Sequence, residues 1–235
     1  MSIYPDPKSP WGKRLWIQEA DFEPMMNNVH AKADGCFTPG RGVDVDAILQ
    51  RVYGVTPDFG DIDETCLGRT RFEVDGSYTV MISRSLADEA ESSVVARRRL
   101  HSTLAHELAH IVYHGVLHPI HDGPALFPEL VELKAVMCRQ DAIEGSSEKP
   151  PWWEYQANRG MAALLLPSDL VKQFLSEALH KRGFADIQEA MNARRGKVVL
   201  QDLMEVFDVS FEMTLYRLQE LGFISKHVGQ GGLTF

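Results

Sequence analysis

Two histidines four residues apart, His106 and His110, enclose the pentapeptide HELAH. On an α-helix, residues four apart lie on the same face one turn apart, so both imidazoles can reach one metal ion. Glu107 follows the first histidine, where its carboxylate can take a proton from a water that Zn²⁺ has made acidic. The pattern predicts a zinc site with His106 and His110 as metal ligands and Glu107 as the catalytic residue.

A catalytic zinc ion needs a third protein ligand and keeps its fourth position open. A third histidine six residues after the second is excluded, because Val116 stands there. The remaining candidates are glutamates on later helical segments, namely Glu154, Glu129 and Glu132. Glu154 is favoured because Asn158 follows one helical turn later and could hydrogen-bond a ligating imidazole. The residue pattern alone leaves all three glutamates open.

The other candidate ligands near the motif are weaker. His114 continues the four-residue ladder beyond His110 but has rotated round the helix, so we expect it to support the site or to pack beside it. His118 and His121 lie in a proline-rich connection, where a loop position is expected. Cys138 is a lone cysteine and is expected to be a small apolar core residue.

The elements before and around the motif can be predicted from local patterns. A helix is expected from about residue 94 to Gly115, because this stretch has helical periodicity and contains no proline. Residues 66–83 predict two strands joined at Asp75-Gly76 by a two-residue type I′ turn, since that dipeptide tolerates positive φ at both positions. Residues 43–53 predict a helix with Asp44 or Asp46 as N-cap.

The segments after the motif predict helices only. A helix starting at the N-cap Ser168-Asp169 is the clearest of them. The expected ranges are 129–140, 152–167, 169–181, 185–193, 198–207 and 211–221. A small sheet followed by many helices is an α+β pattern.

We predict three parts of the chain. The first forty residues show no sustained periodicity and are expected to form an irregular segment, 1–40. A catalytic domain is expected at 41–180, followed by a helical C-terminal extension at 181–235 that is similar to a helix-turn-helix.

Three stretches together resemble the ImmA/IrrE family of metallo-endopeptidases. They are GRTRFEVDGSYTVMIS before the motif, STLAHELAHIVYH around it, and EYQANRGMAALLLP after it. The last is similar to the family's E-x-E-A-N-x-F-A-A-x-L-L-M-P, and the resemblance covers roughly residues 40–222. It implies an α+β, zincin-like fold with a small antiparallel-containing sheet and an HExxH active-site helix. It also implies one Zn²⁺ per chain held by His106, His110 and Glu154, with Glu107 as general base.

The sequence departs from the family pattern at several positions, none of which removes a ligand or the base. Gln156 replaces the usual Glu, Gly160 stands where an aromatic residue is common, and Met161 stands where Ala is common. Ala109 takes the place of a frequent glycine. In a helix interior, Gly160 costs about 1 kcal/mol relative to alanine, and we expect substrate preference to differ accordingly.

The resemblance implies cleavage of a helix-turn-helix repressor of the XRE type, which relieves repression of stress-response or mobile-element genes. Two other function classes compete with this one. A DNA-binding regulator would act through the C-terminal helix-turn-helix-like region, and a zinc-bound interaction or toxin protein would not hydrolyse peptides. The retained Glu107 argues against the second, because a structural zinc site has no need of a base.

The charge of the chain bears on its partners. The 235 residues include 24 Lys+Arg and 33 Asp+Glu, a formal net charge of −9. This argues against direct nucleic-acid binding, which needs clustered Lys and Arg to neutralise phosphates. Residues 54–93 hold nine acidic and three basic residues, a net −6, so we expect them to steer a basic protein substrate to the site.

We further hypothesise that the second hairpin strand pairs with an extended segment of the substrate, because strand addition supplies backbone hydrogen bonds with little sequence demand. The residues expected to pair are Thr79, Val80, Met81 and Ile82. An ordinary edge strand is the alternative interpretation.

The compartment follows from cysteine usage and apolar runs. Three widely spaced cysteines without a CxxC pair predict reduced thiols rather than a disulfide framework. The N-terminal residues lack a signal-peptide pattern, and no apolar run approaches the roughly 18 residues of a membrane span. We therefore expect a cytoplasmic protein with no membrane association.

Overall fold

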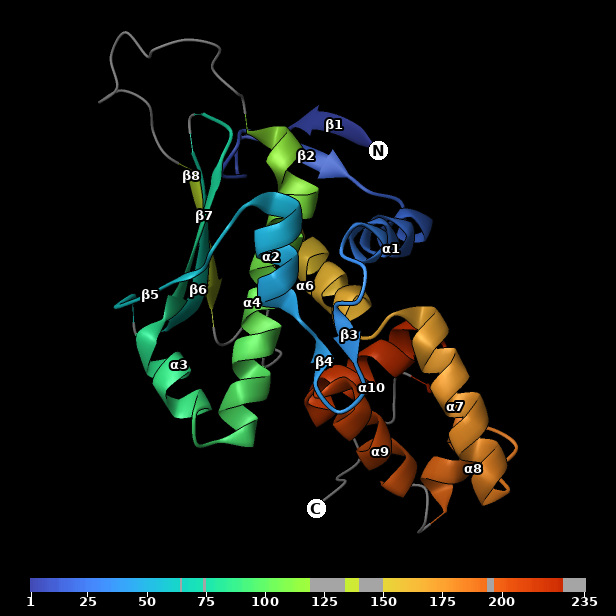
Figure 1. The fold of residues 1–235 in the computed structure, drawn as a ribbon. Coiled ribbons are helices and arrows are strands. Elements are labelled where there is room, and N and C mark those ends of the chain that lie inside the picture. The colour runs from blue at the N-terminus through green and yellow to red at the C-terminus, as the bar shows by residue number, and fades with distance from the viewer. Residues whose placement is uncertain (64, 74, 119–133, 140–149, 194–196, 226–235) are drawn as a thin grey trace, which may run out of the picture. The chain divides into compact units, whose positions relative to one another are not determined.

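The computed structural model describes residues 1–63, 65–73, 75–118, 150–193 and 197–225, and the backbone of 134–139 (Figure 1). Its contacts divide the chain into two compact units. The first unit holds Met1–Cys36 and Asp44–Met161, and the second holds Phe37–Val43 and Ala162–Phe235. These contact boundaries differ in position from the predicted ones at 40 and 180. The predicted division into a segment, a catalytic domain and a C-terminal extension stays a prediction.

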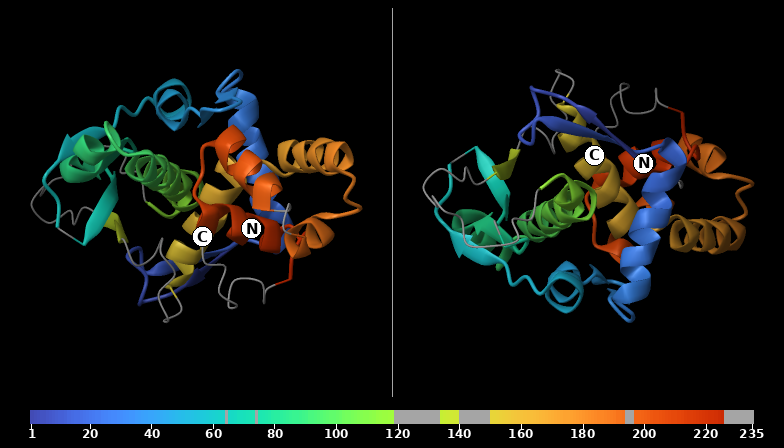
Figure 2. Two further views of the ribbon diagram at one scale, coloured as in Figure 1. Left: turned by 90° about the horizontal axis from the view of Figure 1, so that it is seen from below. Right: turned by 90° about the horizontal axis from the view of Figure 1, so that it is seen from above.

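The first unit is built on a four-stranded sheet in the order β5-β7-β6-β8. The strands are β5 (Asp58–Gly60), β6 (Cys66–Phe72), β7 (Tyr78–Ser83) and β8 (Lys134–Arg139). Strand β6 pairs antiparallel with both β7 and β8, whereas β5 runs parallel to β7. Helix α3 (Arg84–Ala90) follows β7, and α4 (Val94–His114) runs beside β6 and β7 (Figure 2).

The predicted hairpin of β6 and β7 is confirmed, but the predicted turn is wrong. The N–H of Gly76 donates to the carbonyl of Glu73, and Gly76 has φ of 85°. The N–H of Glu73 donates to the carbonyl of Ser77 at 3.0 Å, so Glu73 and Ser77 close the hairpin, whereas a two-residue turn at Asp75-Gly76 would be closed by residues 74 and 77. Instead, Asp75 Oδ1 accepts hydrogen bonds from the N–H and hydroxyl of Ser77, a local alternative that aspartate offers the backbone.

The predicted helical piece 129–140 is corrected over the part that the structure describes. Lys134–Arg139 forms strand β8, paired with β6 from Cys66 to Phe72. Without β8, one edge of β6 would present unpaired N–H and C=O groups. Long-range pairing of this kind overrides local helical periodicity, which carries no information about a neighbouring strand.

Helix α4 matches the predicted range, and local signals define both of its ends. The side chain of Ser93 caps the first turn by accepting a hydrogen bond from the N–H of Ala96 at 3.2 Å. The helix ends at His114, directly before Gly115. From Ser102 to Ile111 every residue is buried, so the motif lies within a closely packed helix rather than on an exposed face.

The first forty residues contain more regular structure than expected. Strands β1 (Ser2–Pro5) and β2 (Lys13–Trp16) form an antiparallel pair, and a short 3-10 helix, η1 (Glu19–Asp21), leads into α1 (Phe22–Lys32). Helix α1 buries Phe22, Met26 and Val29, which are spaced at i, i+4 and i+7. Pro24 and the polar residues between these positions interrupt the apolar pattern, so the sequence of this segment predicts no helix.

Two further helices complete the first unit. Helix α2 (Val45–Tyr53) has Asp44 as its N-cap, one of the two predicted, with Oδ1 accepting from the N–H of Ala47 at 2.9 Å. Gly54 ends it in the left-handed conformation, with φ of 67°. Helix α6 (Trp152–Leu165) begins in this unit and crosses the contact boundary at Met161.

The second unit is helical apart from a two-stranded ribbon. The helices are α7 (Ser168–Arg182), α8 (Ile187–Asn192), α9 (Lys197–Phe207) and α10 (Phe211–Glu220), close to the predicted ranges. Helix α7 starts at Ser168 with Pro167 as N-cap, so the predicted cap is wrong. Strands β3 (Phe37–Thr38) and β4 (Gly42–Val43) belong here because the ring of Phe37 packs 5.2 Å from that of Phe207.

The observed mixture of small sheets and many helices is α+β, as predicted. In the part of the chain that the structure describes, no helix has both the length and the apolar character needed to cross a bilayer.

Candidate metal centre

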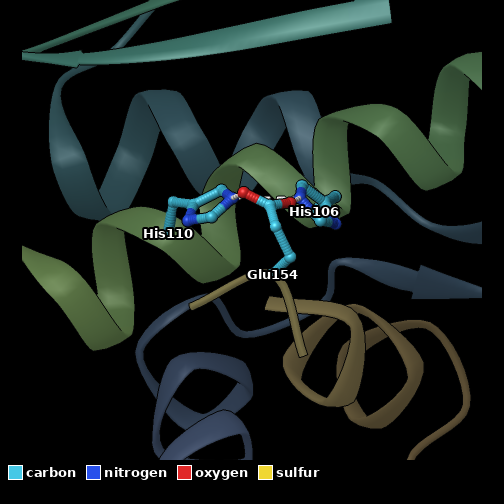
Figure 3. Close-up of side chains that lie close together, drawn as sticks. All are labelled: His106, His110 and Glu154. Carbon is cyan, nitrogen blue, oxygen red and sulfur yellow. Dashed lines mark hydrogen bonds and ion pairs between the residues drawn. The ribbon is translucent and has the colours of Figure 1, made fainter. Parts of the chain in front are cut away.

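Helices α4 and α6 bring two histidines and one glutamate together. His106 and His110 project from one face of α4, and Glu154 reaches them from the first turn of α6, with its carboxylate between the two imidazoles (Figure 3). The ligand atoms of all three residues lie within 4.8 Å of one another. All three side chains are buried. Burying polar groups costs free energy unless they are paired or bind a ligand, so the cluster differs from a chance grouping of polar residues on the surface.

The distances within the cluster suit a small divalent cation. The Nε2 atoms of the two histidines are 2.9 Å apart, and Glu154 oxygens lie 3.0 Å from His106 Nε2 and 3.7 Å from His110 Nε2. Ligands about 2.1 Å from a tetrahedral zinc ion are separated by about 3.4 Å. The nitrogen and oxygen donor set and its spacing therefore fit a metal ion such as Zn²⁺.

The start of α6 explains how Glu154 is positioned. Pro150 and Pro151 precede the helix, and the N–H of Tyr155 donates to the carbonyl of Pro151 at 3.0 Å, which closes the first turn. A carboxylate in this turn is favoured by the helix dipole. Asn158 lies one turn beyond Glu154 and its Oδ1 is 3.0 Å from His106 Nδ1, so α6 holds both nitrogens of the same imidazole.

Burial and charge set the protonation states that metal binding requires. Burial lowers the pKa of His110 below its usual value, against the opposing effect of Glu154. Burial alone would raise the pKa of Glu154, but the interaction with His110 and hydrogen bonds with both histidines outweigh it and lower the pKa. A neutral imidazole and an ionised carboxylate are the forms that bind a metal ion.

The catalytic candidate Glu107 is held from the side of the sheet. Its carboxylate Oε2 accepts a hydrogen bond from the hydroxyl of Thr70 on β6 at 2.5 Å. Gly68, on the same face of β6, leaves the space that the carboxylate occupies, because a Cβ there would lie 2.7 Å from Glu107 Oε1 and 2.7 Å from Thr103 Cγ2. Strand β6 thus fixes the side chain that follows the first histidine.

Comparison with known proteins identifies the family. The sequence profile of the Peptidase_M78 family, described as the IrrE N-terminal-like domain, matches residues 70–219, more than half of the chain. The chain belongs to this family. A sequence search among curated proteins gave no match. Membership supports a peptidase of the metal-dependent type, and the helix-rich structure with small sheets fits an α+β, zincin-like fold.

Two departures from the family pattern meet in the structure of this IrrE-like domain. A Cβ at Gly160 on α6 would lie 2.8 Å from Ala109 Cβ on α4, 2.5 Å from Tyr113 Cε2 and 2.7 Å from Met26 Cε. The methyl group of Ala109 therefore occupies the space above Gly160. These two small residues set how closely α4 and α6 approach each other.

His114 lies next to the cluster and contacts His110. Its Nδ1 is 2.9 Å from His110 Nδ1, and its Nε2 is 3.1 Å from Gln156 Oε1. Burial and the neighbouring His110 lower the pKa of His114 well below its usual value. The sequence shows Gln156 only as a departure from the family pattern, because its contact with His114 on another helix leaves no local signal.

The predicted substrate strand is only partly available for pairing. Met81 and Ile82 pair with β6 on one side and with Asp58 and Phe59 of β5 on the other. The prediction that a substrate strand pairs at these two positions is therefore wrong, because β7 is an interior strand there and its backbone groups already pair with β5 and β6. Thr79 and Val80 pair with β6 and lie beyond the register of β5.

The remaining candidates do not join the cluster within the described part of the chain. The ring of His118 packs 5.9 Å from Phe72. Glu129, Glu132 and His121 lie outside the described residues, and Cys138 lies in β8, whose backbone alone is described.

Replacement of Gly68 by alanine tests the seat of Glu107. We expect kcat to fall about 10²-fold, because a shift of the carboxylate by the order of 1 Å misplaces a reacting group. Metal affinity should stay unchanged, since the three atoms nearest to an added Cβ belong to Glu107 and Thr103 and not to His106, His110 or Glu154. The comparison is steady-state kinetics and metal titration on variants with cooperative thermal unfolding.

Gly60→Ala is the matched control for this variant. A Cβ at Gly60 on β5 would meet Met81 Sδ at 3.3 Å, a contact that a flexible side chain can accommodate. An unchanged kcat in Gly68→Ala would show that Glu107 does not depend on the space at position 68.

Proposed function

We propose that this protein is a zinc-dependent endopeptidase. The observation that carries the proposal is the buried His106, His110 and Glu154 cluster, with Glu107 beside it, in a chain of a peptidase family. Buried structural zinc sites are closed by four protein ligands, whereas three ligands with an adjacent carboxylate are typical of hydrolytic sites.

The residues divide the work of peptide hydrolysis among them. A bound Zn²⁺ would supply Lewis-acid polarisation of the scissile carbonyl. His106, His110 and Glu154 would hold the ion, and Asn158 would orient the ring of His106. Glu107 takes the proton from the attacking water and delivers it to the leaving amine, while Thr70 keeps its carboxylate in place.

The proposed substrate is a basic helix-turn-helix repressor of the XRE type, cut in a stress-response or mobile-element circuit of the cytoplasm. The acidic residues of the stretch 54–93 support a basic partner, because most of their carboxylates are exposed. The exposed members are Asp58, Asp61, Asp63, Asp75, Asp88, Glu89 and Glu91. Their field would accelerate encounter with a positively charged protein.

The DNA-binding alternative loses support from the one arginine of α10. Arg217 is 2% exposed, and it donates to the carbonyl of Leu166 and to the carboxylate of Glu220. A guanidinium committed in this way does not reach a phosphate backbone. In α10 the exposed side chains include Glu212 and Tyr216, which do not supply the positive charge that DNA binding needs.

Cleavage of a candidate repressor tests the proposal. The full chain, loaded with Zn²⁺, is incubated with purified XRE-type regulators from the same genome, starting with any that is encoded beside its gene, and the fragments are mapped by mass spectrometry. We expect one or a few internal cuts that a chelator prevents. The cleavage rate should fall as salt rises from about 50 to 500 mM, because salt screens the acidic surface. Intact regulator under all conditions would contradict the repressor substrate, and salt-independent cleavage would contradict the steering.

A further inference from the structure

A continuous chain of hydrogen bonds leads from the N-terminal hairpin to the metal cluster. Gln156 Nε2 donates to the carbonyl of Leu15 on β2 at 2.8 Å. Gln156 Oε1 lies 3.1 Å from His114 Nε2, and His114 Nδ1 lies 2.9 Å from His110 Nδ1. The other ring nitrogen of His110, Nε2, faces His106 and Glu154 in the candidate metal cluster.

The donors and acceptors along this series of hydrogen bonds can be assigned in one way only. A backbone carbonyl only accepts, so the amide group of Gln156 that faces Leu15 must be its NH₂. The amide oxygen then faces His114, whose Nε2 must carry the proton. In a neutral imidazole the other nitrogen is bare, so His114 Nδ1 accepts from His110 Nδ1–H.

This assignment leaves His110 in the tautomer that binds metal. With its proton on Nδ1, His110 has a free lone pair on Nε2, which points to Glu154 and His106. The opposite tautomer would aim an N–H at the ion. The remote carbonyl of Leu15 therefore determines which nitrogen of His110 can act as a ligand.

The surroundings of His114 separate its imidazole from bulk water. His114 is 0% exposed, and the rings of Trp11 and Trp152 lie 5.0 and 5.6 Å from its imidazole. Gln156 is buried as well. If the glutamine oxygen were removed, His114 Nε2–H would be left buried without an acceptor, a state that protein interiors avoid.

We propose that Gln156 is a positioning residue that fixes the tautomer of His110 through His114, and so raises the affinity of the site for its metal ion. The inference rests on the proposed role of His110 as a metal ligand. It also gives the N-terminal hairpin a role: Leu15 lies outside the matched family region, residues 70–219, yet it anchors the chain of hydrogen bonds.

Two substitutions separate positioning from packing. Gln156→Leu keeps the volume but removes the acceptor, so His114 moves its proton to Nδ1 and forces the proton of His110 onto Nε2. We expect metal affinity to fall about 10- to 100-fold, the usual effect of losing a partner behind a ligating histidine. Gln156→Glu keeps an acceptor for His114 but loses the donor to Leu15, so it should retain wild-type affinity or better despite lower thermal stability.

The readouts are competition of Zn²⁺ against a chelator and the ¹⁵N resonances of the histidine rings in the metal-free protein. We expect a bare Nδ1 on His114 and a protonated Nδ1 on His110 in the wild type, reversed in Gln156→Leu. Equal affinity of the Leu variant and the wild type, or a protonated Nδ1 on His114 in the wild type, would overturn the inference alone. Failure of the wild type to bind Zn²⁺ would instead overturn the proposed function.

Discussion

Replacing Glu107 with glutamine is expected to lower kcat by roughly 10²- to 10⁴-fold, the range that loss of a general base produces. The amide oxygen of glutamine can still accept from the hydroxyl of Thr70, so the fold and the neighbouring ligands should not change. What the variant loses is the basic oxygen that takes a proton from water. Cleavage is measured in single turnover with enzyme in excess, and metal content by titration on the same samples.

Glu73→Gln is a matched control for this prediction. Glu73 is a half-buried residue of the β6–β7 hairpin, which also holds Thr70. Its carboxylate accepts a hydrogen bond from the hydroxyl of Thr79 at 2.8 Å, as that of Glu107 does from Thr70. It lies outside the metal cluster, so kcat should stay at the wild-type value. If the Glu107 variant bound metal normally and kept full biological activity, the protein would be a zinc-bound interaction protein rather than a peptidase.

The sequence allowed prediction of those parts of the fold that depend on local patterns. The range of α4 follows from its periodicity, and Asp44 and Gly54 at the ends of α2 follow from capping chemistry. The candidate ligands on α4 follow from the four-residue spacing alone. Glu154 needed a second argument, because spacing gives no relation between residues on different helices.

Long-range contacts account for what could not be predicted. Strand β8 exists because β6 has an unpaired edge, and β7 is interior because β5 joins it in parallel. Thr70 and Gly68 support Glu107 only through the packing of β6 on α4. No property of one segment reveals such a partner.

Gly160 shows how a residue that weakens its own helix can stabilise the fold. In an isolated helix, replacement of glycine by alanine would stabilise by about 1 kcal/mol. Here the added methyl group would lie 2.5 Å from the ring of Tyr113 and 2.8 Å from Ala109 Cβ, and both of these residues are fully buried. Overpacking of this kind costs typically about 1–3 kcal/mol, so the contact outweighs the propensity.

Gly160→Ala is therefore expected to lower the free energy of unfolding and, more strongly, the metal affinity. The clash lies between α4 and α6, one residue from His110, and its relief moves these helices apart. Because Glu154 and the two histidines lie on opposite sides of that contact, we expect zinc affinity to fall by about 10-fold or more. The measurements are thermal unfolding of the metal-free protein and chelator competition.

The double variant Ala109→Gly/Gly160→Ala separates this effect from the chemistry of residue 160. Removing the methyl group of Ala109 clears the 2.8 Å contact, so part of the lost affinity should return, although Ala109→Gly alone weakens α4. A non-additive recovery is expected because the two positions share one contact. A Gly160→Ala protein that is more stable than the wild type and binds zinc equally well would show that helix propensity, and not the approach of α4 to α6, governs this position.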